Sequence, residues 1–311
     1  MHIYKSLNGL YPRGEKLIKV TRDYDRGRVD ETQLVEAYEA DRQALFKLQE
    51  GLDLQYDGLL NWQDLLRPFV EIWDAVRVDG LVRYYETNTF FRVIEFGDNV
   101  RLNEPQIEVW FDKYFHKPHG GLWFAYLPAP TLVRRFAKGA TLKVIADIML
   151  ETTHYIIPKV DAVYFGDPSL VYDGVSVDDM QVLRKFYAMV KRELGSKLLL
   201  LMTYFASPDE EKLNFLVSLE VDAIGLDFVH AEYELLKRLH WPHDKGIAAG
   251  VFDTENSLIE SPNTVIQFVQ MLAEELNPQF IVITGSSDWH FLPRTCADKK
   301  VQVLKSLPKT L

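Results

Sequence analysis

The sequence has little of what marks a secreted, membrane or nucleic-acid-binding protein. Its single cysteine, Cys296, excludes an intrachain disulfide and any metal site built from several cysteines. Its longest apolar run, residues 198–202, is far shorter than the roughly 20 residues that a membrane span requires. A net charge of −10, from 35 basic and 45 acidic residues, disfavours a nucleic-acid or anionic-membrane partner. We therefore expect a cytoplasmic protein with no nucleic-acid and no membrane partner.

Linkers and nucleotide-binding turns are also missing. No Pro-, Gly- or Ser-rich stretch divides the 311 residues, and no Gly-x-Gly-x-x-Gly turn follows any expected strand. A β/α barrel of roughly 250 residues with extensions fits this length. We expect one domain over residues 1–311, in which residues 1–50 form a helical extension packed on the barrel.

Short β-rich runs alternate with segments of helical period along the rest of the chain. This alternation indicates a parallel sheet, and eight runs favour a closed (β/α)8 TIM barrel of the α/β class over an open doubly wound sheet. Asp30 and Gln33 stand where a capping pair would begin a helix, which Gly51 ends. The predicted strands are residues 52–56, 81–89, 121–127, 162–166, 197–205, 223–229, 246–252 and 280–284.

Polar residues follow most of these strands. The chemistry of a β/α barrel is placed at the carboxyl ends of its strands, so these residues are the candidates for a site. A ring of carboxylates and amides suits general acid/base work or the binding of a polar ligand, although such residues also cap helices. The rim candidates are Glu86, Asn88, Asp167, Asp227 and Asp253.

A glycosidase site and a zinc site are the alternatives for the same rim. Glu86 paired with Asp167 or Asp227 would suit a glycosidase, and Trp289 could line a sugar or pterin site. Zinc needs three or four ligands, and no histidine pair has the helical His-x-x-x-His spacing with a glutamate between. We expect no metal to be bound by this chain.

Several blocks, in the same order along the chain, resemble the amino-terminal half of cobalamin-independent methionine synthase, a barrel of the uroporphyrinogen decarboxylase superfamily. The blocks cover nearly the whole chain. They are residues 11–14 (Tyr-Pro-Arg-Gly), 24–29, 83–92 (beginning Arg-Tyr-Tyr-Glu-Thr-Asn), 166–170 (Gly-Asp-Pro-Ser-Leu), 203–205, 225–229, 249–253 and 285–287.

The resemblance implies a role in methyl transfer from a methyl-folate-like small molecule to homocysteine. The full-length family enzyme has two similar barrels, and its carboxyl-terminal barrel holds zinc through His, Cys and Glu. Ser287 stands at the position of a thiolate ligand here, so we expect the zinc on a separate catalytic barrel of the carboxyl-terminal type. The resemblance also assigns Lys16, Lys19 and Arg83 to binding of an anionic folate tail. For Lys16 and Lys19, the competing interpretation is a solvated helix face.

Three hypotheses follow. The leading one is an amino-terminal-type component of a cobalamin-independent methionine synthase system, inactive without a catalytic barrel. The second is a self-sufficient zinc-free methyltransferase or a related superfamily enzyme. The third is a noncatalytic barrel scaffold whose rim residues only cap helices.

Overall fold

A computed structural model describes residues 1–231, 236 and 241–310. Its centre is a sheet of eight parallel strands in the order β1-β11-β10-β9-β8-β7-β5-β2. Asp53 N, before β2, donates to Lys5 O of β1 at 3.0 Å, which brings the two ends of the sheet together. The predicted (β/α)8 barrel is confirmed. The strands are β1 (Ile3–Lys5), β2 (Leu54–Gln55), β5 (Leu122–Pro128), β7 (Ala162–Gly166), β8 (Leu198–Met202), β9 (Ala223–Asp227), β10 (Gly246–Phe252) and β11 (Ile281–Gly285).

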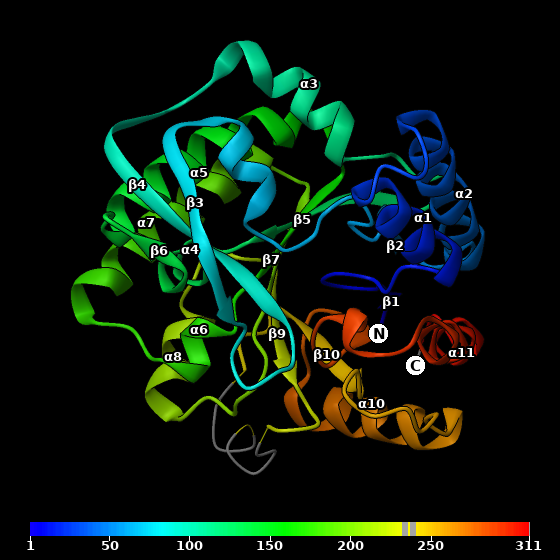
Figure 1. Ribbon diagram of the computed structural model, residues 1–311. Coiled ribbons are helices and arrows are strands. Elements are labelled where there is room, and N and C mark those ends of the chain that lie inside the picture. The colour runs from blue at the N-terminus through cyan, green and yellow to red at the C-terminus, as the bar shows by residue number, and fades with distance from the viewer. Residues whose placement is uncertain (232–235, 237–240, 311) are drawn as a thin grey trace.

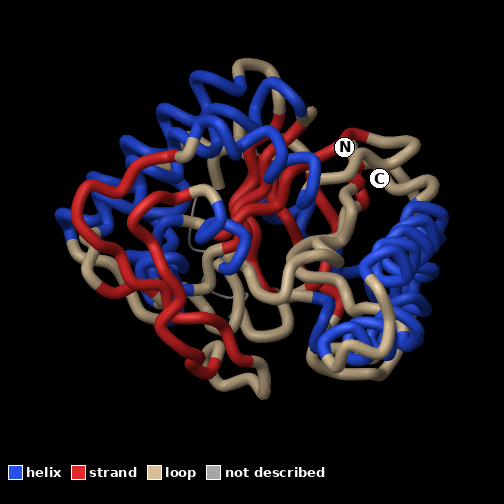
Figure 2. Tube along the Cα trace, turned by 45° about the horizontal axis from the view of Figure 1, so that its top comes forward, coloured by secondary structure: helices blue, strands red, loops and turns tan. Residues whose placement is uncertain are grey.

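Helices surround the strands, which gather at the centre of the molecule (Figures 1 and 2). The two ends of the chain lie side by side, because Ile3 N donates to Lys309 O at 3.0 Å. The α-helices are α1 (Glu15–Asp25), α2 (Glu31–Gln49), α3 (Glu104–Tyr114), α4 (Pro130–Arg135), α5 (Leu142–Ile156), α6 (Ser169–Tyr172), α7 (Val177–Leu194), α8 (Glu210–Val217), α10 (Pro262–Leu276) and α11 (Arg294–Ser306). Short 3-10 turns cover Arg67–Glu71, Ile157–Lys159 and Trp289–Phe291.

The start of α2 follows the sequence closely. Gln33 N donates to the Asp30 carboxylate at 2.9 Å, and Asp30 N donates to the Gln33 side chain at 3.1 Å. This reciprocal capping box satisfies two backbone donors that a helix start leaves unpaired. The predicted cap is therefore confirmed.

One predicted barrel strand is wrong. Residues 81–89 do not enter the barrel; they end β3 (Trp73–Arg83) and form the turn into β4 (Phe90–Leu102). These long antiparallel strands make a separate three-stranded sheet with β6 (Ala137–Lys138). The remaining barrel strand is β1, inside the predicted extension, and its three residues are too few for a periodic pattern. The hairpin runs along the outside of the molecule (Figure 2).

The hairpin is anchored at one end and exposed at the other. Trp73 stacks on Phe69 with ring centroids 4.8 Å apart, and its indole donates to Thr152 of α5 at 2.9 Å. Toward the tip, β3 is exposed from Arg77 onward. The chain between β3 and β4 then turns back over the rim of the barrel, which places residues 84–89 beside the carboxyl ends of β8 and β11.

Candidate functional site

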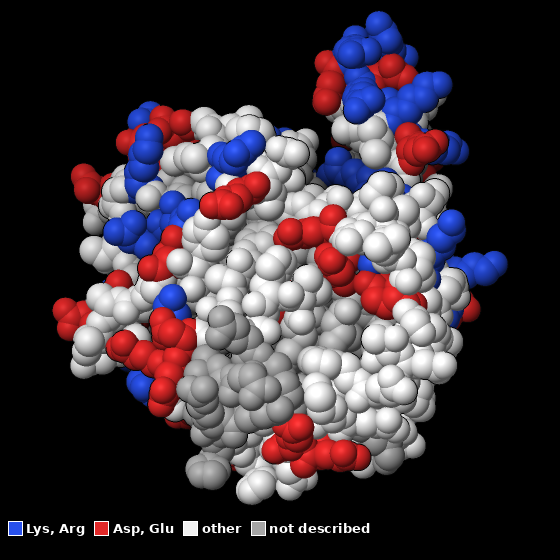
Figure 3. All heavy atoms as spheres, turned by 90° about the horizontal axis from the view of Figure 1, so that it is seen from below, with Lys and Arg blue, Asp and Glu red and all other residues white. Residues whose placement is uncertain are grey.

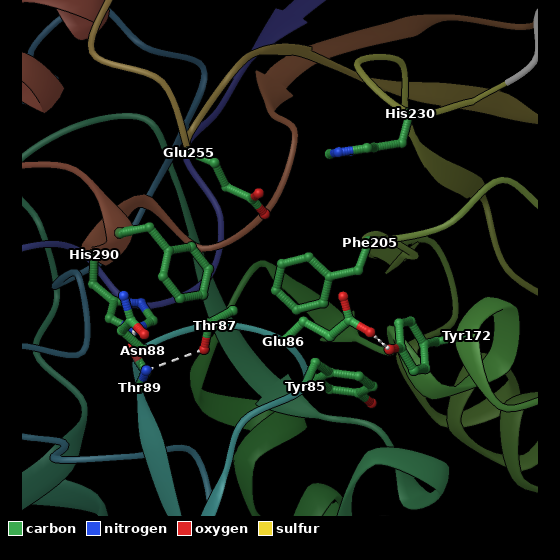
Figure 4. Close-up of a pocket in the computed structure, with 11 residues that line it drawn as sticks. Tyr85, Glu86, Thr87, Asn88, Thr89, Tyr172, Phe205, His230, Glu255 and His290 are labelled. Carbon is green, nitrogen blue, oxygen red and sulfur yellow. Dashed lines mark hydrogen bonds between the residues drawn. The ribbon is translucent and has the colours of Figure 1, made fainter.

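A cavity of about 550 Å³ opens between the hairpin tip and the barrel rim. Glu86 and Asn88 line it, as do side chains that follow β8, β9, β10 and β11 (Figure 4). The lining comprises Tyr85, Glu86, Thr87, Asn88, Thr89, Tyr172, Phe205, His230, Glu255, His290 and Phe291. We call this the rim pocket. Its position is where β/α barrels place their chemistry.

Aromatic rings form a continuous strip along the rim pocket. Tyr172 contacts Tyr85 at a centroid distance of 5.0 Å, and Tyr85 contacts Phe205 at 5.3 Å. Phe205 lies 5.8 Å from Phe291, which in turn lies 4.2 Å from His290. Such a strip offers a flat apolar surface and ring faces that carry partial negative charge.

Two rings of this strip lie on unusual backbone. Tyr85 has φ +50° and Phe205 has φ +70°, the left-handed region that side chains rarely adopt. A non-glycine residue held there costs about 1 to 3 kcal/mol, and such residues cluster at ligand sites. The fold therefore places both rings at some cost in stability.

An imidazole–carboxylate pair borders the rim pocket. His230 Nδ1 lies 2.8 Å from Asp227 Oδ2, and the buried carboxylate also accepts from Val229 N at 3.0 Å. Burial raises the pKa of Asp227. Burial of His230 opposes its charge, but the Asp227 carboxylate outweighs it, so the pKa of His230 is raised. His230 and Glu255 both point toward the middle of the rim pocket (Figure 4).

The two carboxylates of the rim pocket lie on different walls. Glu86, on the hairpin tip, accepts from Tyr172 Oη at 3.0 Å. Glu255 follows β10, and burial raises its pKa. Because Glu255 is partly desolvated and lies near the His230 imidazole, its carboxylate can bind a cation or exchange a proton.

Of the predicted rim residues, Asp167 and Asp253 lie away from the rim pocket. Asp167 is fully buried and accepts from Thr131 Oγ1, and burial raises its pKa to about 7. Its Oδ1 has no partner among the described residues. Asp253 instead accepts from Glu255 N at 2.9 Å in a turn that begins no helix. The structure thus brings together Glu86, Asn88 and, through His230, Asp227.

The predicted tail-binding residues lie outside the cavity. Arg83 is exposed beside it and donates to Asn88 Oδ1 at 3.4 Å. Lys16 and Lys19 are exposed on α1, whose Ile18 lines a second hollow of about 300 Å³. His290 borders both hollows. Arg83 is therefore the predicted basic residue that adjoins the rim pocket.

The sequence did not single out the aromatic strip or Glu255. Tyr85 comes from a segment that the sequence placed in a barrel strand, whereas the sequence assigned no element to the segment of Tyr172; the hairpin fold brings the two rings together. Glu255 lies two residues after Asp253, so its place after the seventh predicted strand was the available signal. Asp288, one of the polar residues that follow the eighth predicted strand, is buried among tyrosines and accepts from Tyr204 at 3.2 Å, and burial raises its pKa to about 6.

The donor set of the described residues does not fit zinc. Among residues 1–231, 236 and 241–310, no group of three or more His, Cys, Asp or Glu side chains could hold a metal ion. Ser287, at the expected thiolate position, is buried and lies 2.7 Å from Thr254 Oγ1. No helix among the described residues is long and apolar enough to cross a membrane.

Comparisons with known proteins agree with the resemblance seen in the sequence. Residues 142–277 match the family model described as the N-terminal domain of cobalamin-independent synthase. A 5-methyltetrahydropteroyltriglutamate–homocysteine methyltransferase of Bacillus velezensis is 28% identical over 195 residues, which are 59% of this chain and 25% of that protein. Its counterpart in Halalkalibacterium halodurans is 30% identical over 139 residues, 43% of this chain and 18% of that protein.

The fold agrees as well. A B12-independent methionine synthase from Shewanella sp. W3-18-1 superposes with a TM-score of 0.72 at 14% identity, covering 98% of this chain and 96% of that chain. A putative B12-independent methionine synthase from Listeria monocytogenes has the same TM-score at 12% identity, covering 97% and 95%. The matched region spans a quarter or less of the curated relatives named above. The predicted resemblance to the amino-terminal domain of cobalamin-independent methionine synthase is confirmed.

Proposed function

Because this chain resembles the amino-terminal domain of cobalamin-independent methionine synthase, we propose that it acts as the amino-terminal-type component of such a system. It would support methyl transfer from a methyl-folate-like donor to homocysteine together with a zinc-bearing catalytic barrel on another chain. In this proposal the chain binds the donor and contacts the partner barrel.

The observation that carries the proposal is the position of Arg83 beside the rim pocket. Its guanidinium reaches Asn88 at the pocket wall, and the structure describes no carboxylate paired with it. Guanidinium groups pair well with carboxylates through charge-assisted hydrogen bonds. A donor whose body lies in the rim pocket could therefore extend a glutamate tail over Arg83. Lys16 and Lys19, on α1, would extend this contact only for a long tail.

The metal-ligating side chains among the described residues support the need for a partner barrel. The metal that activates homocysteine must bind its sulfur as a thiolate, and zinc sites are built from cysteine, histidine and carboxylate ligands. The described residues offer no such group, and Cys296 lies on α11. A zinc-bearing barrel on another chain would supply this chemistry.

The hairpin beside the rim pocket offers a surface for that barrel. Leu81 and Phe90 are 64% and 54% exposed, and Val82 is 41% exposed. Exposed apolar side chains grouped at one place mark interaction sites more often than scattered ones do. A partner seated here would cover the mouth of the rim pocket, where two barrels must meet to share a donor.

The proposal is tested by donor binding to the whole chain. We expect 5-methyltetrahydropteroyltriglutamate to bind more tightly than its monoglutamate, and Arg83→Ala to weaken the triglutamate about 5-fold, since one exposed charge-assisted contact contributes about 1 kcal/mol. Isothermal titration calorimetry measures both.

Arg77→Ala is the matched control, because Arg77 lies on the same strand and pairs with Glu95. It should leave triglutamate affinity unchanged. Equal affinity for the two donors, or an equal loss in the two variants, would contradict a tail site at Arg83.

A self-sufficient zinc-free methyltransferase remains the second candidate, and the His230–Asp227 pair favours it. A histidine oriented by a buried carboxylate is a common general base. Methyl transfer by the isolated chain that is lost in Asp227→Ala would support this candidate and count against the need for a partner.

A further inference from the structure

The charged groups among the described lining residues of the rim pocket are two carboxylates and one imidazole, which is paired with a further carboxylate. None of its described lining residues is lysine or arginine, whereas Glu86 and Glu255 supply two carboxylates. His290 lies against Phe291, and burial lowers its pKa to about 4, which leaves that ring neutral. His230 is the lining side chain that can carry a positive charge, and Asp227 compensates it.

The neighbouring guanidiniums do not alter this balance. Arg135 packs on the rings of Tyr85 and Tyr172, 4.3 Å and 5.4 Å from their centroids, but does not line the cavity. It pairs with Asp173, so its charge is already met. Arg83 lies outside, beside Asn88. On the face seen from below in Figure 3, acidic side chains lie near the middle and also at the left and lower edges, while Lys and Arg lie mainly at the periphery.

The remaining lining consists of three uncharged polar residues, Thr87, Asn88 and Thr89, and four aromatic residues. Four rings, those of Tyr172, Tyr85, Phe205 and Phe291, follow one another in contact. The faces of aromatic rings attract cations, and cages of such rings bind quaternary ammonium groups. Carboxylates at the edge of a ring cluster add a Coulomb attraction that a neutral ligand would not gain.

One buried polar atom in the lining also has no partner. His290 Nδ1 is buried and makes no hydrogen bond with the described residues, while its Nε2 lies 3.3 Å from Thr89 Oγ1. A buried polar atom without a partner is uncommon and calls for an explanation, such as a bound ligand group. A ligand seated on the aromatic strip would reach this end of the cavity, next to Phe291.

From the carboxylates and the ring strip, we propose that the rim pocket binds a methylated organic cation, an ammonium or sulfonium group seated on the aromatic strip between Glu86 and Glu255. This inference goes beyond the proposed function and concerns the ligand chemistry of the rim pocket alone. Cation binding itself requires neither a partner nor a folate.

The test compares ligands of equal shape and different charge on the unaltered chain. We expect choline to bind at least 5-fold more tightly than 3,3-dimethylbutan-1-ol, its neutral isostere, in calorimetry at pH 8 and low salt. Because the protein is the same in both titrations, folding of a variant does not enter the comparison. Equal affinity, or tighter binding of the neutral alcohol, would overturn the proposal.

Two further titrations test whether the cation binds in the rim pocket and which kind of methylated cation binds there. Glu255→Gln should weaken choline at least 3-fold, whereas Glu193→Gln, a carboxylate that contacts His154 and lies outside the lining, should not. Loss of choline affinity in Glu193→Gln equal to that in Glu255→Gln would overturn the assignment to the rim pocket.

Trimethylsulfonium and tetramethylammonium then report which methylated cation fits better, and binding of neither would contradict the proposal. Triglutamate titration of Arg83→Ala tests the folate site separately, so the two proposals can fail independently.

Discussion

Asp167 shows how burial at the rim makes a single residue sensitive to pH. The folded pKa is about 7 and the ordinary value is 3.8, because burial disfavours the carboxylate. Between these values the folded state binds more protons than the unfolded state, so this group makes the protein less stable as pH rises from about 4 to 7. One pKa unit corresponds to about 1.4 kcal/mol, so the full effect is on the order of a few kcal/mol.

Asp167→Asn should remove that slope. We expect the variant to be more stable than the parent chain at pH 8 and to differ little at pH 4, in urea denaturation followed by circular dichroism. The isosteric amide keeps an acceptor for Thr131. The free energy of unfolding of the parent chain should fall relative to that of the variant between pH 4 and pH 7. If it does not fall, Asp167 is not a carboxyl group held neutral by burial.

His230 gives the rim pocket its own pH dependence. Its pKa is raised because the attraction of Asp227 outweighs burial, and Glu255 and Asp253 are the other described carboxylates that favour its charge. Deprotonation of His230 and ionisation of Glu255 both make the pocket more negative as pH rises. Choline affinity should therefore increase several-fold from pH 5 to pH 8.

An NMR titration of the His230 imidazole identifies the groups that set this pH dependence. In Asp227→Asn the His230 pKa should fall, because the carboxylate that favours the imidazolium is gone, and the affinity increase should move to lower pH. Glu86→Gln is the control, since Glu86 is not among the groups that shift His230. An unchanged His230 titration in Asp227→Asn would exclude the pair as the cause.

The sequence identified only some of the residues that form the site. Asp227 was found because it lies at the carboxyl end of a correctly expected strand, whereas Glu86 and Asn88 reach the rim pocket on the hairpin tip and not on the barrel strand that was predicted for them. Side chains that reach the pocket through tertiary folding, such as Tyr172, carry no local signal. Whether any of them binds a ligand remains a prediction.

Among the elements, the β3–β4 hairpin explains both the main error of the sequence analysis and the shape of the site. Residues 81–85 (Leu-Val-Arg-Tyr-Tyr) are rich in β-forming side chains, and this enrichment does not distinguish an external hairpin from a barrel strand. The antiparallel partner, Phe90–Leu102, was not recognised. Strands with buried, continuous apolar runs, such as Leu198–Met202, were placed correctly because buried parallel strands read that way.

The hairpin is expected to depend on its anchor rather than on its surface pairs. Trp73→Ala should lower the free energy of unfolding by about 3 to 5 kcal/mol, because a buried indole and its bond to Thr152 are lost. Arg101→Ala, which removes an exposed pair with Asp74 on the same hairpin, should change it little. Chemical denaturation measures both, and a Trp73→Ala loss as small as that of Arg101→Ala would exclude this anchor.

For the whole molecule, the fold was readable because barrel alternation repeats along the chain and each repeat adds to the same conclusion. The resemblance in sequence and in structure points to the same family domain. Function is less determined, since one barrel fold hosts many chemistries and the chain matches a quarter or less of the curated relatives named above. The division into a barrel over residues 1–311 with a helical extension over 1–50 likewise stays a prediction, although β1 lies in the first 50 residues.

The exposed hairpin residues should matter for assembly and not for the stability of this chain. Leu81→Asp should weaken association with a zinc-bearing catalytic barrel at least 5-fold in analytical ultracentrifugation. Val109→Asp, at an exposed position of α3, is the matched control and should not. Equal effects of the two substitutions would exclude the hairpin as the contact.

The most direct test of the account is methionine formation from 5-methyltetrahydropteroyltriglutamate and homocysteine. It compares this chain alone with added zinc, a zinc-bearing catalytic barrel without its amino-terminal half, and the two combined. The account predicts no methionine from this chain alone and a rate from the mixture well above that of the catalytic barrel. Methionine formed by this chain alone, or a mixture no faster than the catalytic barrel, would contradict it.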